Sequence, residues 1–149
     1  MKKIEHIGIA VKDLQAANEL YAKLLQTESY KSEKVKSEGV GTSFFKTGES
    51  KIELLAATSE DSAVAKFLAK RGEGIHHIAF EVDDIKAEMK RLKAEGFELI
   101  SKRPKKGADN KLVAFLHPKS ANGVLVELCE EIKDGEEYIP IGDEVWEDL

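Results

Sequence analysis

The pattern of hydrophobic and polar positions repeats itself half-way along the chain. Residues 6–14 and 77–85 each consist of a histidine, a largely apolar run, an acidic residue and the first apolar residue of an amphipathic segment. Residues 51–55 and 124–128 each place one glutamate in an otherwise apolar run. Such internal similarity predicts two copies of one supersecondary module.

The first half is predicted to form a βαβββ module at about residues 4–57. Asp13 is expected to cap a helix, and strands are expected near 29–36, 41–47 and 51–56, with a turn at residues 48–50. Helical periodicity predicts one buried face on that helix, made of Leu14, Ala17, Leu20, Tyr21 and Leu24.

The second half repeats this plan at about residues 75–131. Asp83 or Asp84 is expected to cap a helix that ends at Gly96, and strands are expected near 97–101, 111–117 and 123–129. The residues expected to face inward from this helix are Ile85, Met89 and Leu92.

The two modules are joined by a predicted linker helix at about 61–71. Ser62 is its expected cap, and Val64, Phe67 and Leu68 are expected to face inward. Residues 135–149 are interpreted as an acidic tail that packs loosely or pairs with another subunit, and Trp146 indicates docking. We therefore predict a single α+β domain with two tandem βαβββ modules.

Composition narrows the function classes. The 149 residues are 42% hydrophobic and carry a formal net charge of -5, which argues against a nucleic-acid or anionic-membrane partner. The single cysteine, Cys129, is expected to pack in the core of a protein from a reducing compartment. Neither a signal peptide nor a membrane span is recognised, so a cytoplasmic location is predicted.

Four polar residues at equivalent positions of the two halves are the candidate functional residues. A strand places His6 on one face with Gly8, which leaves room above the ring, while Glu53 and Glu127 stand in β-forming runs where a carboxylate is costly to bury alone. A lone histidine is usually hydrogen-bonded or at the surface, and a lone glutamate in a strand usually faces solvent. Duplication at equivalent positions favours the other interpretation, a divalent metal held by His6, Glu53, His77 and Glu127.

Two further histidines are not assigned as ligands. His76 precedes His77 but points the other way along a strand, so it is expected to support the site or the fold. His117 lies in the segment His-Pro-Lys-Ser at 117–120.

Several longer stretches resemble the methylmalonyl-CoA epimerases of the vicinal oxygen chelate (glyoxalase/bleomycin resistance/dioxygenase) superfamily. The resemblance runs from about residue 4 to 131, and its most specific segments are His-His-Ile-Ala and His-Pro-Lys-Ser. The stretches that carry it are 6–11, 51–55, 61–68, 72–80 and 114–128.

The resemblance implies a partly open barrel that contains the metal, a homodimer, and the same four ligands. Cobalt, manganese, nickel and zinc all suit such a site. Glu127 is the candidate acid/base group, because a carboxylate at the metal can also exchange a proton with the substrate. Some epimerases have a second acid/base glutamate where this chain has Thr42. Either Glu127 does more than bind metal or another group supplies the second proton transfer.

Substrate contacts are predicted in the second half. Lys119 and Ser120 are candidates for binding a substrate carboxylate or the phosphates of CoA, although a solvated turn explains them equally well. A basic cluster beside them, Lys102, Arg103, Lys105 and Lys106, is a second candidate for those phosphates.

Three alternatives remain open. A glyoxalase I-like lactoylglutathione lyase would use the same ligands and related chemistry. A non-catalytic small-molecule-binding module would need no metal, which the four occupied ligand positions argue against. A ring-cleaving dioxygenase is disfavoured, because that chemistry favours two histidines and one carboxylate.

Overall fold

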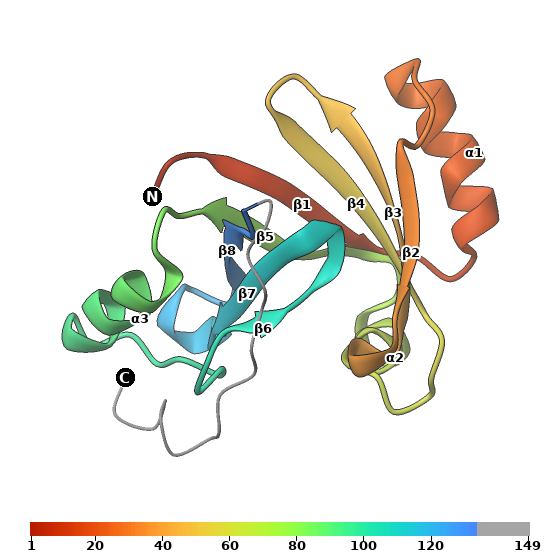
Figure 1. Cartoon of the computed structure of the whole chain (residues 1–149). Coiled ribbons are helices and arrows are strands. Elements are labelled where there is room, and N and C mark those ends of the chain that lie inside the picture. Colours follow the sequence, from red (N-terminus) through yellow and green to blue (C-terminus); the bar gives the residue numbers. More distant parts are fainter. Residues whose placement is uncertain (134–149) are drawn as a thin grey trace. The chain divides into compact units, whose positions relative to one another are not determined.

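The computed structural model describes residues 1–133, so the predicted acidic tail and Trp146 lie outside the described residues. The chain divides into two compact units, coloured in sequence order in Figure 1. The first unit is Glu5–His77, and the second is Met1–Ile4 together with the chain from Ile78 onward.

The first unit carries one βαβββ module and the linker helix. Its strands are ordered β2-β3-β4-β1, with β1 parallel to β4 and the other neighbours antiparallel. Asp13 caps α1 as predicted, since its carboxylate accepts a hydrogen bond from the backbone N–H of Ala16 at 3.1 Å. The elements are β1 (Ile4–Ala10), whose first residue belongs to the second unit, α1 (Leu14–Leu25), β2 (Lys31–Val35), the 3-10 helix η1 (Lys36–Glu38), β3 (Val40–Thr47), β4 (Ser50–Ala57) and α2 (Ala63–Arg71).

Helix α1 buries a narrower face than the sequence predicts. Leu14, Ala17 and Tyr21 pack against the core around Phe45 and Leu54, and Figure 1 shows the helix beside β3 and β4. Leu20 and Leu24 are 62% and 67% exposed, so their predicted burial is wrong. Ala22 and Leu25 pack against the same core, and Leu20 and Leu24 lie roughly 80–120° around the helix from the centre of the stripe that all five packed residues form.

Helix α2 matches its prediction closely. The Ser62 hydroxyl accepts a hydrogen bond from the backbone N–H of Ala65, and Gly72 ends the helix. Val64 is buried, with Phe67 and Leu68 packed against the same cluster.

The second unit carries the other module, in the strand order β5-β8-β7-β6. Asp84 rather than Asp83 caps α3, and Ile85, Met89 and Leu92 fill the core as predicted. Cys129 is fully buried, also as predicted. The elements are β5 (Gly74–Glu81), whose first residues belong to the first unit, α3 (Ile85–Ala94), β6 (Lys105–Lys106), η2 (Ala108–Asn110), β7 (Lys111–Leu116), η3 (Pro118–Ser120) and β8 (Val126–Glu131).

The strand predicted at 97–101 is wrong. That segment makes one isolated bridge, Leu99 to Leu116, and the regular pairing with β7 resumes only at the short strand β6. Pro104 lies between the two pieces and has no backbone N–H to donate to a ladder, so the edge is interrupted there.

Both modules pair their strands in the same way, which confirms the α+β class and the two tandem βαβββ modules. In each, the opening strand is parallel to the closing strand, and the small residue two positions after the histidine stands opposite the glutamate. These pairs are Gly8 with Glu53 and Ala79 with Glu127. That the modules act as one domain stays a prediction. Within residues 1–133, none of the helices has the length and apolar character needed to cross a membrane.

Candidate metal centre

The first unit brings three of the four predicted ligands together. The Nε2 atoms of His6 and His77 lie 3.0 Å apart, and Glu53 Oε1 lies 3.2 Å from the first and 3.3 Å from the second. All three side chains are buried. The atoms that converge are the ones with which histidine and glutamate bind metals.

The distances between these atoms are those expected when all three bind one shared metal ion. Two donors that each lie about 2.1 Å from one ion, at a right angle, are about 3.0 Å apart. Neutral imidazole nitrogens and a carboxylate oxygen at such distances repel one another unless a proton or a cation lies among them. The three residues therefore fit a divalent metal, which agrees with the prediction from the duplication.

Strand register explains how the chain places these side chains. Gly8 stands opposite Glu53 on the parallel pair β1–β4, so His6 and Glu53 project from the same face. Gly8 itself leaves room for the second histidine: a Cβ atom at this position would lie 2.1 Å from Cε1 of His77. The absence of a side chain at residue 8 is thus a condition for the site.

Glu53 is held by a hydrogen bond that sequence reasoning missed. The Thr42 hydroxyl donates to Glu53 Oε2 at 2.8 Å, while Oε1 faces the two histidines. Burial raises the pKa of Glu53, but the ring nitrogens of His6 and His77 beside Oε1 outweigh it and hold that pKa well below its usual range. The carboxylate is therefore ionised and oriented.

Each histidine contacts the residue that precedes it. His6 Nδ1 donates to Glu5 Oε1 at 3.0 Å, and Lys51 Nζ donates to Glu5 Oε2 at 2.9 Å. In the other module, the Nδ1 atoms of His76 and His77 lie 3.0 Å apart. His76 thus supports the site, as one of its two predicted roles stated.

The pKa values of the two preceding residues are both lowered, for different reasons. Burial raises the pKa of Glu5, but its bonds with His6 and Lys51 prevail and lower it to about 2. Burial, followed by the nearby His77, lowers the pKa of His76 to about 4. One histidine therefore has an anionic neighbour and the other a neutral one at ordinary pH.

Glu127, the fourth predicted ligand, lies in β8 of the second unit. Its side chain is buried, opposite Ala79 on β5 and Phe115 on β7. This is the register position that Glu53 occupies in the first module.

The predicted substrate residues also lie in the second unit. Lys119 is exposed, with Nζ 3.8 Å from a Glu98 carboxylate oxygen, and the Ser120 hydroxyl accepts a hydrogen bond from the Glu98 backbone N–H. His117 caps η3 by accepting a hydrogen bond from the Lys119 backbone N–H. This loop is therefore anchored, with the Lys119 ammonium directed to solvent. Of the basic cluster, Lys102, Lys105 and Lys106 are exposed and Arg103 is half-buried.

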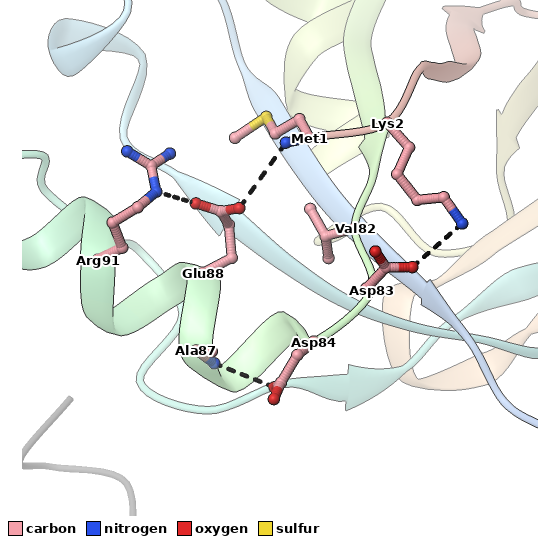
Figure 2. A pocket seen from close by; sticks show the side chains of 8 residues that line it. All are labelled: Met1, Lys2, Val82, Asp83, Asp84, Ala87, Glu88 and Arg91. Carbon is pink, nitrogen blue, oxygen red and sulfur yellow. Dashed lines mark hydrogen bonds and ion pairs between the residues drawn. The ribbon is translucent and has the colours of Figure 1, made fainter.

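An open hollow near the N-terminus of α3 contains none of the predicted ligands (Figure 2). Its charges pair with one another: the Met1 amine and Arg91 contact Glu88, and Lys2 contacts Asp83. The other residues that line it are Val82, Asp84 and Ala87. This mutual pairing leaves the metal centre as the stronger candidate site.

A family model described as the Glyoxalase/Bleomycin resistance protein/Dioxygenase superfamily matches residues 5–115. The chain is 44% identical over 128 residues to the ethylmalonyl-CoA/methylmalonyl-CoA epimerase of Cereibacter sphaeroides, covering 85% of this chain and 96% of that protein. It is 43% identical over 130 residues to the mitochondrial methylmalonyl-CoA epimerase of Dictyostelium discoideum, covering 87% of this chain and 78% of that protein.

A solved structure with the same fold adds a bound substrate. It is a methylmalonyl-CoA epimerase in complex with methylmalonyl-CoA and NH4+, and it superposes with a TM-score of 0.83 at 38% identity, covering 88% of this chain and 95% of that one. The resemblance stated from the sequence is thereby confirmed.

Proposed function

Because the chain belongs to the glyoxalase/bleomycin resistance protein/dioxygenase superfamily, we propose that it is an isomerase that epimerises methylmalonyl-CoA at C2. The observation that carries the proposal is the convergence of His6, Glu53 and His77. These residues converge in a chain whose match to such an epimerase spans most of its own length and most of the relative's length. The reaction removes the C2 proton and returns it to the opposite face.

The proposed ligands of a divalent metal are His6, Glu53, His77 and Glu127. Support for the first three is their mutual distances, and support for Glu127 is its burial and its register position, which repeats that of Glu53. When bound, such a metal supplies Lewis acidity and positive charge, which make the C2 proton easier to remove. Cobalt, manganese, nickel and zinc all accept this donor set.

Side chains of this protein must remove the C2 proton of the substrate and deliver a proton to the opposite face. C2 lies between a thioester and a carboxylate, and inversion needs proton removal on one face and delivery on the other, by two groups or by one that moves. We assign one of these transfers to the carboxylate of Glu127. Its burial keeps bulk water from competing for the proton.

Thr42 cannot supply the second transfer. An alkyl hydroxyl is too weak a base to remove a carbon proton, and this hydroxyl already donates to Glu53 Oε2 in a fully buried position. In this chain residue 42 instead holds a proposed ligand in place.

Lys119 and Ser120 are proposed to bind the substrate carboxylate or the CoA phosphates. Exposure of the Lys119 side chain and the anchoring of its loop support this, since a cation on a fixed loop binds an anion at a smaller entropic cost. The homodimer implied by the resemblance stays a prediction, as does the single domain formed by the two modules.

A substrate panel tests the assignment against its nearest alternative. We expect the metal-loaded protein to racemise one enantiomer of methylmalonyl-CoA, followed by chiral chromatography of the released acid. The hemithioacetal of methylglyoxal and glutathione should remain unconverted under the same conditions.

The reverse result would replace the epimerase with a glyoxalase I-like lyase. No turnover of either compound, together with no metal binding, would contradict both enzymes and favour a binding module.

A further inference from the structure

We propose that Glu5 and Lys51 are positioning residues that fix the His6 ring for metal binding and make it the more electron-rich of the two histidine ligands. This inference rests on the proposed metal site. It concerns two residues that sequence reasoning did not single out.

The three side chains form one line of hydrogen bonds. Lys51 Nζ donates to Glu5 Oε2 at 2.9 Å, and His6 Nδ1 donates to Glu5 Oε1 at 3.0 Å. The Glu5 side chain is only 3% exposed. A carboxylate buried to this extent is retained only with strong partners, and here each oxygen has one.

Strand register makes the three residues neighbours in the sheet. Lys51 is the direct register partner of His6 on the parallel pair β1–β4, and Glu5 precedes His6 on β1. From this position the Glu5 carboxylate reaches both the ring and the ammonium.

The contact with Glu5 determines which nitrogen of the His6 ring carries the proton and which one is available to a metal. A proton held on Nδ1 by Glu5 leaves the lone pair of Nε2 directed at Glu53 and His77. A carboxylate that accepts the Nδ1 proton also increases the basicity of Nε2, as it does in carboxylate–histidine–metal arrangements. Lys51 keeps the Glu5 carboxylate oriented and balances its charge.

The second module lacks this charged support. His76 takes the place of Glu5, and the register position that corresponds to Lys51 holds Leu125, since Ile78 pairs with Val126. The partner of His77 Nδ1 is therefore another imidazole, 3.0 Å away. The duplication preserved the two histidine ligands, but the residue that precedes the ligand and contacts its Nδ1 is a carboxylate at His6 and an imidazole at His77.

Two variants separate this role from a structural one. Glu5→Gln keeps the shape and removes the charge, whereas the double variant Glu5→Leu/Lys51→Met replaces the buried pair with apolar residues, a change that is often neutral or stabilising for folding. Glu33→Gln is the matched control, because it breaks a more exposed pair with Lys31 in the same unit.

Zinc affinity is measured by competition with a chelator, with the thermal stability of the metal-free proteins alongside. We expect both Glu5 variants to bind zinc about 10–100-fold more weakly, and Glu33→Gln to bind it as the wild type does. In the zinc-loaded wild type, nitrogen-15 NMR should find the His6 ring proton on Nδ1, with a hydrogen-bonded signal that moves or disappears in the double variant.

Wild-type affinity and an unchanged ring signal in both Glu5 variants would overturn the positioning role while leaving the metal site intact. A wild-type protein that fails to bind zinc, cobalt, manganese and nickel would overturn the proposed metal site, and the positioning role with it.

Discussion

Gly8→Ala is expected to abolish the metal centre without a substitution at any ligand. The new Cβ atom would lie 2.1 Å from Cε1, 2.5 Å from Nδ1 and 2.6 Å from Nε2 of His77, so the whole ring must move. Metal affinity should fall by at least about 100-fold, beyond the effect of losing a group that only orients a ligand. Competition with a chelator measures it, and epimerase activity should fall in parallel.

Gly41→Ala is the matched control for this substitution. Both glycines lie on strands of the first unit, but a Cβ atom at residue 41 would meet only Leu14 and Thr58, at 3.7 and 3.8 Å, which are ordinary contacts. Its metal affinity should equal that of the wild type. Retained affinity in Gly8→Ala would contradict the close approach of His77 to β1.

A double-mutant cycle keeps this test informative if Gly8→Ala folds poorly. Overpacking in a buried site costs about 1–3 kcal/mol. In a His77→Ala background the ring is absent, so Gly8→Ala should then have little effect on the free energy of unfolding. Equal destabilisation in both backgrounds would show that the glycine is needed for another reason.

Glu127→Gln is expected to retain the metal and lose the chemistry. An amide oxygen can still bind a cation, but the amide cannot accept and return a proton, so exchange at C2 should slow by about 10²–10⁴-fold. The rate of solvent deuterium incorporation into methylmalonyl-CoA measures this, with metal content determined on the same sample.

Glu131→Gln provides the comparison for Glu127→Gln, because this residue is exposed at the end of the same strand, β8. It should exchange at the wild-type rate. If Glu127→Gln did so too, the proton transfer assigned to Glu127 would be wrong, although its role as a ligand could stand.

Local signals made much of the fold predictable. Asp13 and Ser62 were recognised as caps because the capping hydrogen bond joins residues three apart, and the inward face of α3 follows from helical spacing alone. Exposure of Leu20 and Leu24 was not predictable, because the width of a buried face depends on what packs against it. The interrupted edge before β6 did have a local signal, Pro104, which the predicted strand at 97–101 did not take into account.

The candidate site was predictable where the chain repeats itself. Duplication pointed to His6, Glu53 and His77, and the structure brings them together. The partners of these residues were missed because they depend on strand register: Thr42 reaches Glu53 from β3, and Lys51 reaches Glu5 from β4. One available signal was the polar residue immediately before each histidine, since Glu5 and His76 both contact the ring that follows.

The most direct test is the metal dependence of proton exchange. The purified protein is treated with a chelator, single metals are restored, and incorporation of deuterium at C2 of methylmalonyl-CoA is followed in deuterated water. We predict that exchange stops without metal, returns with at least one of cobalt, manganese, nickel and zinc, and is lost in His77→Ala at every metal. Exchange at an unchanged rate in the metal-free protein, or no exchange with any of these metals, would contradict a metal-dependent epimerase.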